Sequence, residues 1–380
     1  MSSKLSVNVY INMIKNFLIL VVLLVSSILS AKQWVEVYSD SPLESSFSYE
    51  SEVLASTRIT FKLSGYFTDN SKNGLKVTSP GGVSLLEKGA PDLPIFSTSI
   101  QVPDLAEMGI EIIESEFVEL NINDIIPSKG NVTRDVNIGS LPFEKGYRYR
   151  QNSLYPVEIS FLRRPHIIRS VRGQAVVFQP FQYNPVLGVL RIYTDIVLAI
   201  KQNGLSADNP LTRYPSKKRG VKEMENIYKN HFPNYMPIND RYTPLDENGS
   251  MLIICHAPFI EAMQPFIDWK VKKGIETTLV DVSTLGDADD IKAFVEEYYY
   301  NHGINFLLLV GDIDQIPSPR FSEGAGSNSP SDTYYGFIPA EDYYPDVFVG
   351  RFSAETEEHV NTMVNRTISY ERYPDTEDGS

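Results

Sequence analysis

The chain has 380 residues, with 34 Lys and Arg against 48 Asp and Glu, and its formal net charge is −14. This acidity argues against a nucleic-acid-binding protein, because no basic face is available for phosphate contacts. The single cysteine excludes an intramolecular disulfide, so stability must come from a hydrophobic core or a bound metal. The length is enough for two folded domains.

Residues 1–31 have the layout of a secretory signal peptide. Lys4 and Lys15 precede the apolar segment 17–25, and small residues lead on to Ala31. This segment is shorter than the roughly 20 apolar residues that a membrane-spanning helix needs. We therefore expect export and cleavage near Ser30 or Ala31, with an uncleaved anchor as the alternative.

Residues 32–205 predict an all-β sandwich. Short β-rich runs alternate with turns that contain Gly, Pro and Asn, which is the spacing typical of this architecture. The run 189–200 also alternates apolar and polar side chains, as expected for a half-buried strand. The predicted strands are 58–63, 74–78, 98–102, 157–161, 174–178 and 189–200.

Residues 206–245 are polar and interrupted by prolines, and they predict an exposed connector. Charge divides at the end of this segment. Residues 242–380 hold 25 Asp and Glu against 8 Lys and Arg, a net charge of −17, which leaves +3 for residues 1–241. This division fits an electrostatic attraction between the two parts. The alternative is that the acidic surface only keeps the protein soluble.

Residues 246–380 predict an α/β domain with a mostly parallel sheet. The segments 251–255 and 306–310 are unbroken apolar runs of strand length, which is typical of parallel strands that are covered on both faces. Asp312 directly follows the second run. Because ligands bind beyond the carboxyl ends of strands in open parallel sheets, Asp312 is a candidate site residue. Helices are predicted at 265–273, 289–300 and 356–372.

Several motifs of this α/β part resemble the catalytic domain of the gingipain-type cysteine peptidases, a caspase-like family of secreted bacterial proteases. These motifs are Val310-Gly311-Asp312, the Ser331–Gly336 segment SDTYYG, and the Asp342–Phe352 segment DYYPDVFVGRF. Upstream, residues 89–94 and 181–185 resemble the propeptide of the same family. The resemblance covers residues 32–380, and it implies a β-sandwich propeptide at 32–205 and a partial caspase-like α/β domain at 246–380.

The resemblance also implies a precursor of a secreted cysteine endopeptidase that acts on proteins or peptides after basic residues. Its propeptide is expected to act as an intramolecular inhibitor. Maturation is expected between Arg241 and Tyr242, with the Lys217 to Arg219 cluster as a second candidate cut. Arg148 and Arg150, in a turn-like segment, are candidate inhibitory residues, and the alternative is that both are ordinary surface arginines.

A calcium site is a further implication of the resemblance. Calcium takes six to eight oxygen ligands from carboxylates and carbonyls. The expected ligands are Asp312, the carbonyl of Pro339, Asp342, the carbonyl of Tyr344, and Asp346. The alternative is a solvated acidic loop with no metal.

Cys255 and His256 are adjacent, but neighbouring strand residues point to opposite faces, so they cannot form a catalytic pair. A thiol within an apolar strand is also normally inert. We assign no catalytic residue in this chain. In the resembled family the histidine lies in a Gly-His-Gly motif and the cysteine in a later segment, and neither motif occurs here, so the chain alone is expected to be inactive.

One other class of function remains open: a secreted calcium-binding, protein-interaction module without protease activity. The coding sequence after Ser380 distinguishes the two, because an open frame with Gly-His-Gly and a cysteine supports the protease and a stop codon supports the module. A serine hydrolase is not indicated, since the chain lacks a G-x-S-x-G turn. We expect no membrane span beyond the signal peptide.

Overall fold

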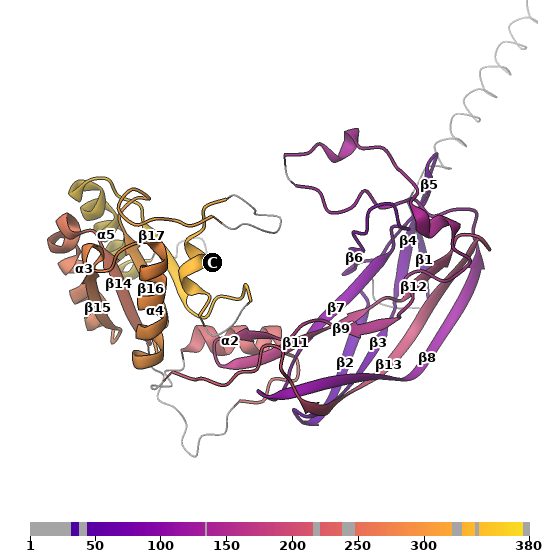
Figure 1. Ribbon diagram of the computed structural model, residues 1–380, viewed down its shortest axis with the longest axis horizontal. Helices are drawn as coiled ribbons and strands as arrows, with labels where there is room; N and C mark the ends of the chain where they lie inside the picture. Colours follow the sequence, from indigo (N-terminus) through magenta and orange to yellow (C-terminus); the bar gives the residue numbers. More distant parts are fainter. Residues whose placement is uncertain are drawn as a thin grey trace, which may run out of the picture.

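The computed structural model describes residues 32–37, 44–133, 135–215, 221–237, 248–320, 329–338 and 342–374. The signal peptide, the Lys217 to Arg219 cluster, the Arg241–Tyr242 junction and Pro339 lie outside the described residues. Within the described part, no helix is long and apolar enough to cross a membrane. The chain forms a β-rich half, indigo to magenta, and an α/β half, orange to yellow (Figure 1).

The β-rich half consists of antiparallel sheets. One sheet has the order β1-β4-β5 and contains β1 (Gln33–Glu36), β4 (Gly65–Ser71) and β5 (Gly74–Thr78). The second has the order β10-β11-β7-β6, with β9 also paired to β11, and contains β6 (Val83–Ser84), β7 (Pro94–Gln101), β9 (Ser160–Leu162), β10 (His166–Ile168) and β11 (Val171–Phe178). The third has the order β12-β13-β3-β2, with β8 also paired to β13, and contains β2 (Ser46–Val53), β3 (Ser56–Lys62), β8 (Ala106–Asn121), β12 (Phe181–Asn184) and β13 (Val189–Leu205).

Aromatic side chains fill the space between the second and third sheets. Phe61 of β3 lies with its ring centroid 5.0 Å from that of Phe96 on β7 and 5.3 Å from that of Phe178 on β11. The apolar residues of β13, such as Ile192 and Ile196, are fully buried in the same core. The predicted all-β sandwich is therefore confirmed, and two short 3₁₀ helices lie in its long loop, η1 (Ile138–Ser140) and η2 (Tyr147–Arg150).

The α/β half contains a four-stranded parallel sheet with the order β15-β14-β16-β17. Alternate residues of β14 face opposite layers: Leu252 and Ile254 pack toward α4, whereas Ile253 and Cys255 pack toward α3 and α5. This two-sided burial explains the unbroken apolar runs and confirms the predicted fold class. The elements are β14 (Ser250–Cys255), η3 (Ala257–Phe259), α3 (Ile260–Lys272), β15 (Glu276–Asp281), η4 (Val282–Thr284), α4 (Ala288–His302), β16 (Phe306–Val310), η5 (Asp332–Gly336), β17 (Phe348–Phe352) and α5 (Glu357–Arg372).

The two ends of α4 are fixed by local sequence. Asp287 caps the first turn, and its side chain accepts hydrogen bonds from the backbone N–H groups of Asp289 and Asp290. Gly303 ends the helix with φ 71°, a conformation that glycine adopts without strain. The chain then runs directly into β16, so the last carbonyl groups of α4 lie beside the amino end of this strand.

The segment predicted as an exposed connector, 206–245, contains a packed helix, which corrects that prediction. This helix, α2 (Lys222–His231), buries Met224 and Tyr228 against the hairpin of β10 and β11. Phe232, directly after the helix, lies against Gly173, where a Cβ atom would approach the ring to 2.2 Å. The polar residues of α2 dominated the sequence pattern, whereas its few apolar residues determine the packing.

Glu371 joins its own helix, α5, to α3. Its carboxylate accepts hydrogen bonds from Lys270 Nζ at 2.6 Å, Trp269 Nε1 at 2.8 Å and Lys273 Nζ at 2.9 Å. Burial would raise the pKa of Glu371, but these three donors outweigh burial and lower the pKa to about 2. The carboxylate therefore stabilises the fold when it is ionised.

We expect Glu371→Gln to lower the free energy of unfolding by about 1–2 kcal/mol at pH 7, a value reduced for solvent screening. Because the folded pKa is depressed, the contribution is complete above the ordinary pKa of 4.5 and is lost as pH falls toward about 2. The difference from wild type should shrink over that interval. Thermal unfolding from pH 7 to pH 2.5 measures this difference, with Glu297→Gln, an exposed carboxylate in α4, as the control. A pH-independent difference would contradict the assignment.

Candidate functional site

The carboxyl end of the parallel sheet carries Asp312, as expected from the sequence. Its Oδ1 accepts a hydrogen bond of 2.8 Å from Ser353 Oγ, just after β17, and this bond lowers the pKa of Asp312. Nearby, Arg351 donates two hydrogen bonds to Asp332, of 2.7 and 2.8 Å, and a third to the carbonyl of Gly311. The motif residues around 332 and 351 therefore fix the loop after β16, through the bidentate geometry that arginine forms with a carboxylate.

Asp346 and Asp342 lie at the opposite end of the sheet from Asp312. Phe306 at the start of β16 pairs with Phe348 at the start of β17, and Val310 pairs with Phe352. Asp346 precedes β17, whereas Asp312 follows β16. The length of the strands therefore separates them by more than about 13 Å, at a rise of about 3.3 Å per residue.

Asp346 is buried and holds two segments of backbone together. Its Oδ2 accepts a hydrogen bond of 2.7 Å from Ile338 N–H, and its Oδ1 accepts one of 2.6 Å from Arg169 N–H in the β-rich half. Burial raises the pKa of Asp346 to about 8, and the two N–H donors act in the opposite direction. Each oxygen accepts a hydrogen bond from one N–H group, which both the ionised and the protonated carboxyl allow.

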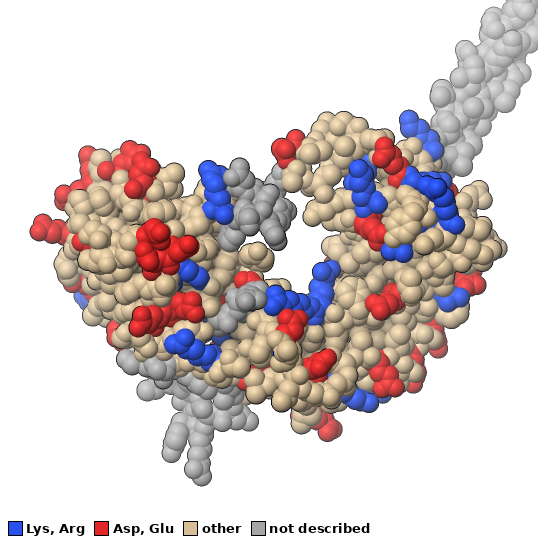
Figure 2. Space-filling view, in the orientation of Figure 1, with Lys and Arg blue, Asp and Glu red and all other residues tan. Residues whose placement is uncertain are grey.

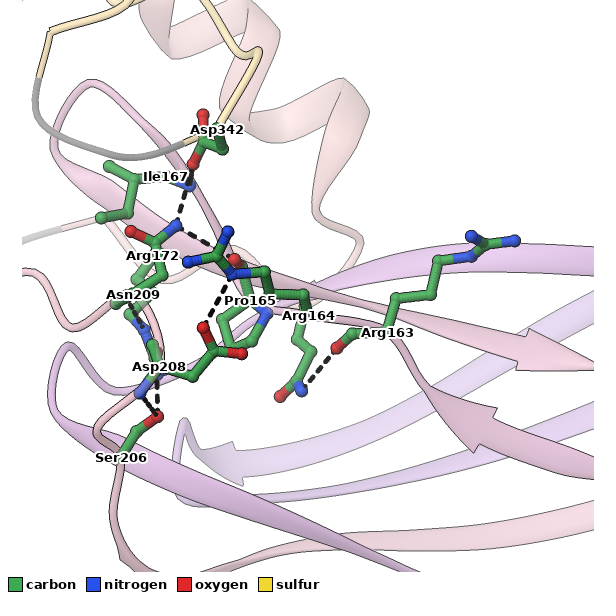
Figure 3. A network of polar contacts seen from close by, with 10 residues as sticks. Arg163, Arg164, Pro165, Ile167, Arg172, Ser206, Asp208, Asn209 and Asp342 are labelled. Carbon is green, nitrogen blue, oxygen red and sulfur yellow. Dashed lines mark hydrogen bonds and ion pairs between the residues drawn. The ribbon is translucent and has the colours of Figure 1, made fainter. Parts of the chain in front are cut away.

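Asp342 also contacts the β-rich half (Figure 3). Its Oδ2 accepts hydrogen bonds from Ile167 N–H at 2.8 Å and from Asn209 Nδ2 at 3.0 Å. Arg172, which is fully buried, holds this region in place by donating to the carbonyl of Asn209 at 2.8 Å and to that of Asp208 at 3.1 Å. Asp342 therefore receives donors that the β-rich half has already positioned.

Arg169 of the β-rich half extends into the α/β half. Its side chain is almost fully buried and lies over the ring of Tyr299, 5.2 Å from the centroid. The guanidinium donates to the carbonyls of Ile304 at 2.6 Å, Asp346 at 3.0 Å and Gly303 at 3.1 Å. The role of this arginine could not be predicted from the sequence, because nothing in the local pattern shows that the hairpin turn after Ile168 meets a distant helix end.

Two histidines and Tyr344 complete the junction. The ring of His166 stacks on that of Tyr344 with centroids 4.3 Å apart, and its Nε2 lies 3.2 Å from Nε2 of His231 in α2. Burial and the nearby His231 lower the pKa of His166 to about 4, and burial also lowers the pKa of His231. Both rings are therefore neutral at pH 7, so that one can donate to the other without charge repulsion.

The predicted calcium ligands do not form one cluster in this structure. Asp312 lies at the other end of the sheet, and the oxygens of Asp342 and Asp346 accept hydrogen bonds from protein N–H groups. Over the described ranges, no group of three or more His, Cys, Asp or Glu is arranged to hold a metal ion. The arrangement therefore does not fit the expected five-ligand site, and calcium binding itself stays a prediction.

Arg148 and Arg150 both lie in η2 of the β-rich half. Arg148 Nε donates to Glu87 Oε1 at 3.0 Å, and its guanidinium lies over the rings of Tyr147 and Tyr155. These contacts of Arg148 are all made within the β-rich half. The inhibitory role of the two arginines stays a prediction, and Arg169 is an arginine of the β-rich half that does contact the α/β half.

Comparisons with known proteins give the same division into two parts. The family model Propeptide_C25 matches residues 48–235, and the model Peptidase family C25 matches residues 244–380. Gingipain R1 of Porphyromonas gingivalis is 40% identical over 304 residues, which is 78% of this chain and 30% of the relative. Lys-gingipain of the same species is 26% identical over 314 residues, 78% of this chain and 18% of the relative.

One solved structure, the complex of Porphyromonas gingivalis RgpB pro- and mature domains, matches with 34% identity and a TM-score of 0.44. The match covers 50% of this chain and 98% of that chain. The chain spans less than half of the length of the curated relatives named above.

The reactivity of Cys255 tests whether its thiol is buried in β14. It is fully buried in β14, and burial together with Asp281 raises the pKa of its thiol to about 12. We expect the native chain to resist alkylation by iodoacetamide at pH 8, because the thiolate is the reactive form. Mass spectrometry after native and denaturing treatment measures the modified fraction, with the denatured chain as the positive control. Rapid native labelling would contradict the burial of this thiol.

Proposed function

Because the chain belongs to the gingipain-type cysteine peptidase family, we propose that it serves as the latent precursor of a secreted cysteine endopeptidase that cleaves after basic residues. Residues up to Arg241 act as the propeptide, and the α/β half belongs to the catalytic domain. We assign no catalytic residue within residues 1–380. The preference for basic residues is carried over from the Arg-type and Lys-type relatives as part of the proposal.

The observation that carries the proposal is the buried junction between the two parts that match the two family models. Arg169 of the propeptide part donates to three carbonyls of the peptidase part, and Asp342 and Asp346 of the peptidase part accept N–H groups of the propeptide. Such contacts exclude water and fix one relative orientation. They support a propeptide that stays docked on the peptidase until it is cut.

Two further observations support maturation between Arg241 and Tyr242. The propeptide model ends at residue 235 and the peptidase model begins at 244, so this bond lies between the two matches. In addition, α2 ends at His231 and packs on the propeptide, so a cut at 241 leaves this helix with the propeptide. Export fits the signal-peptide layout of residues 1–31.

The alternative of a calcium-binding interaction module depends on free carboxylates at Asp342 and Asp346. In this structure one oxygen of each accepts hydrogen bonds from the propeptide part, and the other accepts one from a backbone N–H of the peptidase part. The peptidase precursor is therefore the better supported of the two functions.

We expect the mature enzyme, expressed from its complete gene, to begin at Tyr242. It should cleave peptides after arginine or lysine and lose this activity after thiol alkylation. Arg241→Gln should block the cut at this bond, whereas Lys229→Gln, which changes an exposed charge in α2, should leave it unchanged. N-terminal sequencing measures the cut. A mature start at another residue defeats the maturation site, and activity that survives alkylation defeats the peptidase class.

The role of Arg148 and Arg150 is tested in the complete precursor that carries Arg241→Gln, so that the chain stays uncut. If either arginine fills the substrate cleft, the double change to alanine should raise the activity of this uncut precursor at least tenfold. Arg163→Ala, at an exposed arginine of the same half, is the control. Because Arg148 also bonds Glu87, thermal unfolding must show that the variant propeptide is still folded. Unchanged latency in a folded variant rules out both residues.

A further inference from the structure

Strand β8 is an edge strand that is exposed on both of its faces. Its strand partner among the described residues is β13, so alternate N–H and C=O groups on its other side meet no described strand. Every residue from 111 to 121 is exposed. Figure 1 shows this part of β8 along the margin of the β-rich half, on the side away from the α/β half. The surface is therefore separate from the junction at Arg169.

The inner face of β8 carries apolar side chains that the second sheet does not cover. Val118 and Leu120 pair with Ile192 and Leu190 of β13, and these two partners are buried in the core of the sandwich. Residues directly opposite each other share one face of a sheet, so Val118 and Leu120 point to the core side. They are nevertheless 49% and 41% exposed. The core of the sandwich is therefore open along β8.

The opposite edge of the same sheet, β2, is closed. β2 alternates exposed and partly buried residues, and its Phe47 and Tyr49 pack against the core. The ring centroid of Phe47 lies 5.3 Å from that of Phe178 on β11 of the second sheet. The second sheet thus covers the sandwich at β2 but not at β8. One more strand beside β8 would cover the apolar side chains that are open there.

β8 is also acidic, because it contains five glutamates and no lysine or arginine. Glu116 lies opposite Asp195 of β13, which places two like charges side by side. Three of the other glutamates make ion pairs with bases of β3 or β13, and exposed pairs of this kind contribute little to stability. These pairs are Glu114 with Arg58 at 4.0 Å, Glu111 with Lys201 at 3.7 Å, and Glu119 with Arg191 at 2.7 Å. Basic side chains on an added strand would therefore complement this edge.

A second copy of β8 is a poor partner for the same edge. Antiparallel pairing of two copies brings apolar residues together when Ile112 lies opposite Val118. The same register places Glu114 opposite Glu116, once on each side of the symmetry axis. Like charges directly opposite each other destabilise a pair of strands. The charge of β8 therefore favours a different chain, one that carries basic residues.

We propose that the open edge of β8, residues 112–120, binds an extended segment of another protein in which apolar residues alternate with lysine or arginine. The segment adds a strand to the sheet, so that main-chain hydrogen bonds supply affinity and side chains supply selectivity. Its apolar side chains cover Val118 and Leu120, and its basic side chains lie beside the glutamates. This interaction goes beyond the proposed function, because it involves neither the peptidase part nor the junction.

The probe for this site is a short fluorescein-labelled peptide in which valine and lysine alternate. Fluorescence anisotropy with the intact 380-residue chain measures its affinity, and hydrogen exchange of residues 107–121 locates it. We expect saturable binding and slower exchange in β8. A peptide of the same composition with its valines grouped at one end, and a peptide in which valine alternates with glutamate, should each bind at least about tenfold more weakly. Equal binding of either control peptide would overturn the proposed pattern of the partner.

Two substitutions in β8 test the site itself. Val118→Lys puts a charge on the inner face, where the added strand would cover it, so affinity should fall at least about tenfold. Val157→Lys, the same change at an exposed valine outside β8, is the matched control. Glu116→Lys should weaken binding about fivefold, because it places like charges opposite each other. Its control is Glu52→Lys on β2, at the other edge of the sheet, and circular dichroism checks that all four variants fold.

Unchanged affinity in both β8 variants, or no binding of the alternating peptide at millimolar concentration, would overturn the proposal. β8 would then be an edge that its glutamates only protect from pairing. Sedimentation of the chain without peptide tests the remaining occupant. A concentration-dependent dimer that Val118→Lys dissociates would also overturn the proposal, because the strand beside β8 would then come from a second copy.

Discussion

The buried charge of Arg169 is the constraint on which the arrangement of the two halves depends. A guanidinium taken out of water needs hydrogen-bond acceptors, since an unpaired buried charge costs several kcal/mol. This chain meets the requirement with carbonyls at the end of α4 and with the segment before β17. These two segments come together only in the folded parallel sheet. The propeptide therefore recognises the assembled α/β half and not a linear piece of it.

The direction of the strands in the parallel sheet explains which residues can contact the propeptide. Both α4 and the acidic segment lead into the amino ends of neighbouring strands, β16 and β17, which are hydrogen bonded in parallel. The propeptide contacts therefore gather at the amino edge of the sheet. Asp312, Ser353 and the Arg351–Asp332 pair gather at the carboxyl edge, where parallel α/β sheets generally place their ligands. Topology thus divides the acidic motif residues into two groups with different surroundings.

The sequence predicted those features that depend on local periodicity. The alternation of β13 and the apolar runs of β14 and β16 follow from burial on one face or on both, and these strands form as expected. The position of Asp312 after β16 was also correct, because it needs only the strand and its direction. The family resemblance came from motifs such as the Arg351–Asp332 pair, whose physical role is visible only in three dimensions.

The missed features depend on contacts between distant residues. The apolar face of α2 is small, and its burial requires Gly173 to leave room for Phe232. Likewise, the carboxylates of Asp342 and Asp346 look the same in sequence whether they bind a metal, water or an edge strand. Their partners are Ile167 and Arg169, more than 170 positions away. No window of local sequence contains that information.

The difference in net charge between the two halves acts over longer distances than the contacts at this junction. Figure 2 shows groups of Asp and Glu over the α/β half, on the left of the view, and mixed charges over the β-rich half. Exposed charges separated by more than about 8 Å are largely screened at physiological salt, whereas buried pairs are not. Surface charge can therefore guide the two halves together, but it cannot select one orientation. That selection falls to a few buried groups, among them Arg169, which combines a full charge, directional donors and a backbone with φ 53°.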